Sequence, residues 1–176
     1  ISLSYLTVIG NSIRHYLSIK TFTSLLTGVI IWIALAIVGV DYAIIWGLIA
    51  FLLNYIPNIG SFIAAVPALL FAIIQLGFGG FIWTGIVFLS VNVLIGSVIE
   101  PKMMGKGMGL STFVVFLSLI FWGFILGTVG MFLSIPLTMS IKIMLEQSPK
   151  TKWIAIALGT GEDAQVILDG PKDSFE

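Results

Sequence analysis

Two long stretches of the chain are apolar without interruption. Residues 21–40 and residues 80–99 each contain twenty residues and no charged side chain. An α-helix rises about 1.5 Å per residue, so each stretch would form about 30 Å of helix, the thickness of the hydrocarbon core of a bilayer. We therefore predict two membrane-spanning helices. The second is expected to stop at Glu100-Pro101, because proline disfavours helix in the residue that precedes it.

The first twenty residues show a different pattern, in which apolar and polar side chains occupy different faces of a helix. Leu6, Ile9, Ile13 and Leu17 recur at spacings of three or four, with polar residues mostly between them. This periodicity is typical of an amphipathic helix. We expect residues 1–20 to lie at the membrane interface, ahead of the first spanning helix.

A third apolar stretch is interrupted in its middle. Residues 57–60 read Pro-Asn-Ile-Gly and separate an arm at 42–56 from an arm at 61–76. Proline removes a backbone donor and glycine permits a sharp turn, so the helix should break between the arms. Arms of this length would give roughly 22–24 Å of helix, which is short for a complete span.

A fourth apolar stretch repeats this pattern. Residues 127–130 read Gly-Thr-Val-Gly and separate arms at 111–126 and 131–145, and a proline follows each break, at Pro67 and at Pro136. The pattern predicts a weak internal repeat of two Pro/Gly-broken helical hairpins that re-enter the membrane. Four short complete spans with tight loops fit the same pattern, so both interpretations stay open. In either case the predicted fold is an all-α, polytopic membrane protein.

The placement of basic residues predicts the orientation of these elements. Lysine or arginine occurs in the short polar segments 14–20, 102–106 and 142–152, whereas Asp41 and the 77–79 link carry no basic residue. Basic segments favour the cytoplasmic side. The first hairpin would then open outward and the second inward, which is the inverted arrangement that secondary transporters use.

The composition agrees with a membrane location for most of the chain. Hydrophobic residues make up 59% of it and charged residues 9%, and the mean hydropathy is +1.15. Soluble domains carry about 25% charged residues, so a water-soluble globule is excluded. Eight of the sixteen charged residues fall in the last 27. We therefore expect an interfacial helix at 1–20, a transmembrane transport core at 21–146 in contact with the lipid bilayer, and a polar cytoplasmic tail at 147–176.

Several other classes of protein do not fit the sequence. The formal net charge is zero, which gives no general attraction to nucleic acid, and the chain has no cysteine for disulfides or thiolate sites. It contains no hydrolase triad, no HExxH zinc motif and no closely spaced pair of carboxylates. We expect neither an enzyme nor a metal or cofactor site.

The first break is the best candidate for a binding site. Pro57 and Gly60 would free backbone carbonyls within the membrane, and Asn54 and Asn58 add amides that both donate and accept hydrogen bonds. Such groups suit a small hydroxylated or ionic solute. A loop at the membrane surface, where these residue types are common, is the alternative.

Helix 80–99 adds two further candidates. Asn92 and Glu100 lie on one helical face with Gly85 and Gly96, and Asn92 is expected at mid-membrane. Glu100, and separately Asp41, are the carboxylates that would couple transport to a proton or sodium ion. The alternative for the face with Asn92 is a seam at which two helices pack. The alternative for Glu100 is an interfacial position, paired with Lys102.

Four runs of residues resemble a known family. They are FLLNYIPNIGS at 51–61, EPKMMG at 100–105, GMGLSTFVVFLSLIFW at 107–122 and GTVGMFLSIPLTMSIK at 127–142. In these runs the chain resembles the autoinducer-2 exporter family of bacterial inner-membrane proteins. The resemblance implies an all-helical, homo-oligomeric permease that exports the small polyhydroxylated signal autoinducer-2, while some relatives are described as sodium/proton antiporters.

The chain departs from the family pattern in two ways. Members usually have a further N-terminal half, which precedes the part that this chain resembles. In the second break, formed by Gly127, Thr128 and Gly130 and followed by Pro136, threonine stands at position 128 where the family often has proline. We predict a secondary transporter, or the C-terminal core of one, that exports a small polar signal by alternating access. A sodium/proton antiporter and a membrane protein with a purely structural or assembly role are the alternatives.

Overall fold

The computed structural model describes residues 3–57, 59–104, 109–146 and 151–159. Within these ranges every regular element is a helix and there is no strand. Three helical stretches are long and apolar enough to cross a membrane, namely Gly10–Val38, Gly60–Met104 and Thr112–Glu146. The predicted all-α fold of a polytopic membrane protein is therefore confirmed.

Helix α1 (Leu3–Val38) joins the predicted interfacial helix and the first predicted span into one helix without a break. The chain as a whole divides into two compact units, one of Arg14–Gly105 and the other of Ile1–Ile13 with Lys106–Glu176. The depth of each segment in a bilayer stays a prediction, as do the boundaries at 20 and 146.

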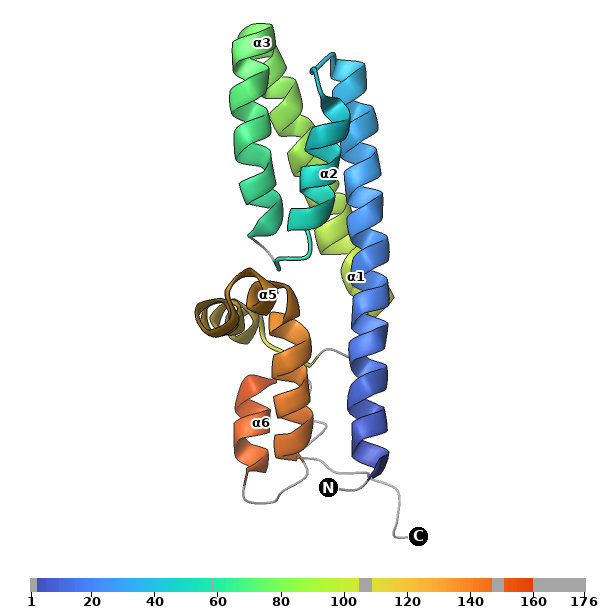
Figure 1. The fold of residues 1–176 in the computed structure, drawn as a ribbon, viewed down its shortest axis with the longest axis vertical. Coiled ribbons are helices and arrows are strands. Elements are labelled where there is room, and N and C mark those ends of the chain that lie inside the picture. Colours follow the sequence, from blue (N-terminus) through green and yellow to red (C-terminus); the bar gives the residue numbers. More distant parts are fainter. Residues whose placement is uncertain (1–2, 58, 105–108, 147–150, 160–176) are drawn as a thin grey trace. The chain divides into compact units, whose positions relative to one another are not determined.

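In the unit Arg14–Gly105, helix α2 (Ala43–Leu53) runs antiparallel to α1, and the first arm of α3 (Gly60–Val91) runs antiparallel to α2 (Figure 1). Small residues allow these helices to approach closely. A Cβ added at Gly28 would lie 2.8 Å from the Gly47 carbonyl oxygen, and one added at Gly47 would lie 2.6 Å from the Gly28 carbonyl oxygen. Close contact through small residues is the usual way in which membrane helices pack.

A single glycine reverses the chain within α3. Gly77 has φ 70° and ψ −160°, which is a conformation that side chains other than glycine rarely adopt. The helix on either side of it forms two arms that lie alongside each other (Figure 1). The predicted link at 77–79 is thus reduced to one non-helical residue.

The prediction that Glu100-Pro101 stops the second span is wrong. After α3 the chain continues as a π-helix, η1 (Asn92–Ile99), and then as α4 (Glu100–Met104). Pro101 lies in the first turn of α4, where a missing backbone N–H is tolerated. The wider turn of the π-helix also relieves the clash between a proline ring and the preceding turn.

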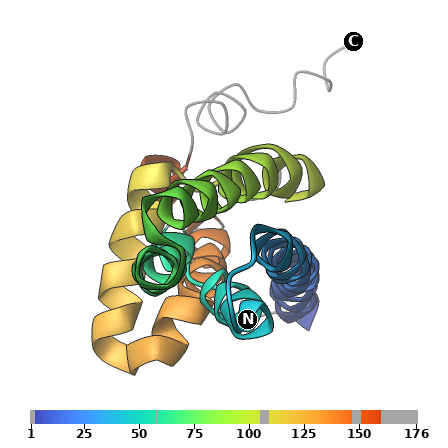
Figure 2. The ribbon, with the colours of Figure 1, turned by 90° about the horizontal axis from the view of Figure 1, so that it is seen from above.

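The other unit contains helix α5 (Thr112–Glu146) and the short helix α6 (Lys152–Leu158). Gly127, with φ 64° and ψ −145°, reverses α5 in the same way that Gly77 reverses α3, and Figure 2 shows the resulting hairpin. The predicted second break is therefore confirmed as a turn. That the hairpins re-enter the membrane stays a prediction, and so does the alternative that they span it.

Candidate functional site

A row of buried polar side chains runs along one face of α1. Tyr16, Lys20, Thr23 and Thr27 are each at most 5% exposed, and Ser24 is fully buried beside them. Spacings of four, three and four residues place the first four on the same side of the helix. The Thr27 and Thr23 hydroxyls donate to carbonyl oxygens one turn earlier, so the row is hydrogen-bonded along the helix itself.

The centre of this row is an ion pair between elements far apart in the sequence. The Lys20 Nζ lies 2.7 Å from Oε1 of Glu100, the first residue of α4, and the side chains are only 6% and 15% exposed. The Thr23 hydroxyl lies 3.3 Å from the other carboxylate oxygen, Oε2, so its one proton is shared between this oxygen and the Lys20 carbonyl oxygen. The Glu100 carboxylate therefore has a cation on one oxygen and a hydroxyl on the other, which is the pairing that a charge within an apolar bundle requires.

The alternative pairing of Glu100 with Lys102 does not occur. Lys102 is exposed, while Glu100 is largely buried against α1. Two residues along an α-helix correspond to a rotation of about 200°, so Lys102 points away from the side on which Glu100 lies.

The first break lies next to the same face of α1. The Asn54 amide donates from Nδ2 to the Ser24 hydroxyl at 3.0 Å, and the Tyr55 hydroxyl donates to Thr21 Oγ1 at 2.8 Å. Two hydrogen bonds thereby join the break between α2 and α3 to α1, one at the buried Ser24 of the polar row and one at the exposed Thr21.

Three further residues were predicted to line the first break, and the structure describes two of them. Pro57 and Gly60 are buried. A Cβ at Gly60 would overlap the Leu53 carbonyl oxygen, so the turn closes only with glycine. Asn58 lies outside the described residues.

Asn92 is the first residue of η1 and is half-buried. Glu100 directly follows η1, about 10 Å further along the same helical rod. The two residues predicted on this helix therefore belong to one continuous segment that ends at the ion pair.

Asp41 lies at the other end of this unit. Its backbone N–H donates to Gln75 Oε1 at 2.8 Å and its carbonyl oxygen accepts from Trp46 Nε1 at 3.2 Å, while its side chain is exposed. The 19 residues of α1 and its end between Lys20 and Gly39 span about 28 Å. The structure therefore does not bring the two predicted carboxylates, Asp41 and Glu100, together.

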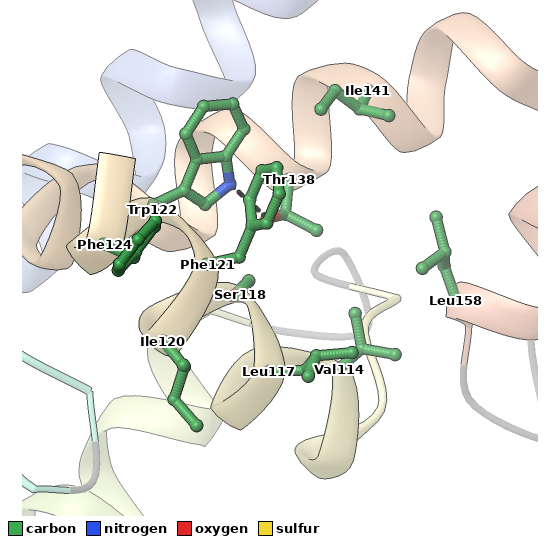
Figure 3. A pocket seen from close by; sticks show the side chains of 10 residues that line it. All are labelled: Val114, Leu117, Ser118, Ile120, Phe121, Trp122, Phe124, Thr138, Ile141 and Leu158. Carbon is green, nitrogen blue, oxygen red and sulfur yellow. Dashed lines mark hydrogen bonds between the residues drawn. The ribbon is translucent and has the colours of Figure 1, made fainter. Parts of the chain in front are cut away.

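The second break has a different environment. Gly127 and Thr128 are exposed, whereas Gly130 and Pro136 are buried. One hydrogen bond crosses this hairpin, from Trp122 Nε1 to Thr138 Oγ1 at 3.0 Å (Figure 3).

Beside that hydrogen bond lies an open, mostly apolar groove of ≈ 540 Å³ (Figure 3). Its lining residues come from both arms of α5 and from α6: Val114, Leu117, Ser118, Ile120, Phe121, Trp122, Phe124, Thr138, Ile141 and Leu158. The Lys20–Glu100 pair and the hydrogen bonds of the first break lie in the other unit, Arg14–Gly105.

Lys20, Thr23 and Ser24 were not predicted as members of a site. Lys20 was expected in an interfacial helix and the two hydroxyl residues in a separate span, so no common face was predicted for them. A periodic signal was present, because polar residues recur at positions 16, 20, 23 and 27, at the three-and-four spacing of one helical face.

The described residues contain two sets of polar contacts at neighbouring positions of α1: a carboxylate with an ammonium and the Thr23 hydroxyl, and the Asn54 amide with the Ser24 hydroxyl. Within the same described ranges there is no group of three or more His, Cys, Asp or Glu residues that could hold a metal ion. The arrangement can therefore exchange hydrogen bonds or a charge with a small polar molecule, and polar groups in this setting commonly line a transport path.

Comparisons with known proteins agree with the resemblance seen in the sequence. The family model described as AI-2E family transporter matches residues 2–150. A putative transport protein of Haemophilus influenzae is 57% identical over 148 residues, which cover 84% of this chain and 42% of the relative. The AI-2 transport protein TqsA of Escherichia coli is 49% identical over 148 residues, covering 84% of this chain and 43% of the relative.

A second relative in Escherichia coli, the putative transport protein YhhT, is 49% identical over 149 residues, covering 85% of this chain and 43% of the relative. The chain thus spans less than half the length of these relatives. The match of the family model over most of the chain, together with these identities, shows that the chain belongs to the family of AI-2E transporters.

Proposed function

We propose that this chain is the C-terminal core of a secondary transporter in the bacterial inner membrane, which exports a small polar signal similar to autoinducer-2. The observation that carries the proposal is the buried Lys20–Glu100 pair, with its row of hydroxyls, inside an apolar bundle. Desolvating two charges costs free energy, so a pair at such a place is commonly retained for function. The relative TqsA is named an AI-2 transport protein, which supports autoinducer-2 as the class of solute.

In this proposal the solute binds at the first break. Asn54, Pro57, Asn58 and Gly60 line its site, with Asn92 reaching it from η1. A polyhydroxylated solute offers several donors and acceptors, and the amide of Asn54 would exchange its bond to Ser24 for a bond to the solute. The Ser24 hydroxyl, which is fully buried, would then also need a partner, and a second hydroxyl of the solute can supply it.

Alternating access would use the two hairpins as gates. The second break, with Gly127, Thr128, Gly130 and Pro136, is the counterpart of the first, and each contains at least one glycine, which permits a sharp change of direction. Glu100 would be the carboxylate that couples export to a proton or sodium gradient. We also propose a homo-oligomer, as the family resemblance implies.

The second candidate function is a sodium/proton antiporter, and the buried Glu100 carboxylate also suits it. Asp41 would be its second carboxylate. Its exposed position, about 28 Å along the bundle from Lys20, favours Glu100 as the residue that carries the exchange.

The test is efflux from lipid vesicles that contain the full-length protein and are loaded with autoinducer-2. An Asn54→Ala variant should slow efflux about tenfold, because one lost hydrogen bond of about 1.4 kcal/mol corresponds to that factor. Asn11→Ala, at an exposed position of α1, is the matched control and should retain the rate.

The same vesicles separate the alternatives. A sodium-dependent proton flux without movement of the signal, recorded with a pH dye inside the vesicles, would favour the antiporter. Absence of both fluxes from correctly inserted protein would favour a structural or assembly role.

A further inference from the structure

The Glu100 carboxylate contacts one ammonium and one hydroxyl, both from α1. Glu100 Oε1 contacts the Lys20 Nζ at 2.7 Å, and Glu100 Oε2 accepts from the Thr23 hydroxyl at 3.3 Å. Thr23 Oγ1 is also 3.2 Å from the Lys20 carbonyl oxygen. Carboxylate, hydroxyl and carbonyl oxygens are the groups that bind small cations, and here the Lys20 ammonium is the cation in contact with the carboxylate.

We propose that Glu100 and Thr23 form a binding site for a small monovalent cation, H⁺ or Na⁺, and that the Lys20 ammonium is a tethered competitor filling this site in the state described. This inference rests on the proposed transport function, in which the cation supplies the driving force. One carboxylate buried in an apolar bundle is neutralised by one positive charge, so the ammonium and the free cation exclude each other.

A released ammonium needs another partner, and Tyr16 supplies it. Tyr16 lies one helical turn before Lys20 on the same face of α1 and is 3% exposed. Among the described residues its hydroxyl has no hydrogen-bond partner. An unpaired buried hydroxyl is costly, and its oxygen can accept a hydrogen bond from the Lys20 ammonium once the cation holds Glu100.

The π-helix η1 gives Glu100 a way to separate from Lys20. The Glu100 backbone N–H donates to the carbonyl oxygen of Ile95, five residues earlier. If this segment returned to the four-residue register of an α-helix, the residues after it would rotate about the helix axis by about 100° for each register step. Short π-segments of this kind are frequent at functional sites.

Few other ionisable groups face the pair from the elements packed against it. From α1 these are Tyr16 and Lys20 themselves, and η1 contributes none. From α4 the nearest is Lys102, which is exposed. Tyr55, from the first break, donates to Thr21 instead. A cation response that depends on Lys20 therefore reports on this pair.

The test measures the thermal unfolding midpoint of the full-length protein in detergent. In one series Na⁺ is titrated at constant pH, with choline keeping the ionic strength fixed, and in the other the pH is varied in choline alone. A response in the first series identifies Na⁺ as the ligand, and a response only in the second identifies H⁺.

Lys20→Gln removes the competitor. It should lower the cation concentration needed for half of the stabilisation by about tenfold or more, because the free cation no longer displaces a buried ammonium. Lys102→Gln is the matched control, since it removes the same charge two residues from Glu100 at an exposed position, and it should change that concentration less than about twofold. Glu100→Gln should abolish the response.

Two milder variants keep the proposal testable if Lys20→Gln does not fold. Tyr16→Phe removes the second partner of the Lys20 ammonium, and should raise the cation concentration needed for half of the stabilisation several-fold. Lys20→Arg should raise the same concentration several-fold, because a guanidinium can hold the Glu100 carboxylate through two parallel hydrogen bonds. Unchanged concentrations in these variants, or equal shifts in Lys20→Gln and Lys102→Gln, would overturn the proposal. Because the assay contains no solute, a shift that depends on Lys20 without any autoinducer-2 efflux would reject the proposed function and leave the cation site standing.

Discussion

The reversal of α5 at Gly127 leads to a prediction about stability. Gly127 has φ 64° and ψ −145°, and a Cβ placed there would meet no atom within 4 Å. Gly127→Ala therefore changes the energy of the backbone conformation without creating a steric overlap. The region of φ and ψ that Gly127 occupies is almost confined to glycine.

The expected loss follows from that conformation. Holding a residue other than glycine in this region costs about 1–3 kcal/mol. Gly79→Ala is the matched control, because Gly79 is an exposed helical glycine with ordinary φ and with no atom within 4 Å of an added Cβ. Alanine is favoured over glycine in a helix by about 0.5–1 kcal/mol, so this control should be stabilised. The two variants should differ by about 1.5–4 kcal/mol.

The assay is unfolding of the full-length protein in mixed detergent micelles with increasing SDS, followed by far-ultraviolet circular dichroism. The free energy of unfolding is compared for the parent protein, Gly127→Ala and Gly79→Ala. A Gly127→Ala protein as stable as Gly79→Ala would refute the reasoning, because the backbone at the second break would then not require glycine.

Three further predictions concern hydrogen bonds and charges. Glu100→Gln should lower the free energy of unfolding by about 3–5 kcal/mol by leaving a buried ammonium without a countercharge, and Lys20→Met in the same protein should restore most of the loss. Trp122→Phe should cost about 0.5–1.5 kcal/mol through its lost bond to Thr138, and Thr138→Val should add little to that variant; additive losses would contradict the contact. Gln75→Leu, which removes two bonds at an exposed turn, should cost less than about 1.5 kcal/mol in the same unfolding assay.

Much of the fold was predictable because the chain changes direction at residues with distinctive backbone chemistry. The break at 57–60 and the turn at Gly127 follow from proline and glycine in otherwise apolar helices. The π-register of η1 was not predictable, since nothing in its sequence distinguishes five-residue from four-residue hydrogen bonding. For the same reason the extension of the helix through Pro101 was missed.

The candidate site was predictable only in part. Asn54 and Glu100 were chosen as polar residues in apolar surroundings, which is a local property of the sequence. The partner of Glu100 is 80 residues away, so proximity in the sequence favoured Lys102 over Lys20. Tertiary packing decides this pairing, and a single sequence carries little information about contacts at such a distance.

The central claim is that the polar row between α1 and the first break opens to water and solute during the transport cycle. It is tested most directly by single cysteines in the full-length protein, with any other cysteines replaced, at Ser24 beside Asn54 and at Ala68 in the apolar core. Both positions are fully buried in the state described. We predict that a membrane-impermeant maleimide labels Ser24→Cys much faster than Ala68→Cys, and that autoinducer-2 slows only the former. Equal labelling rates at the two positions, unaffected by the solute, would contradict the account.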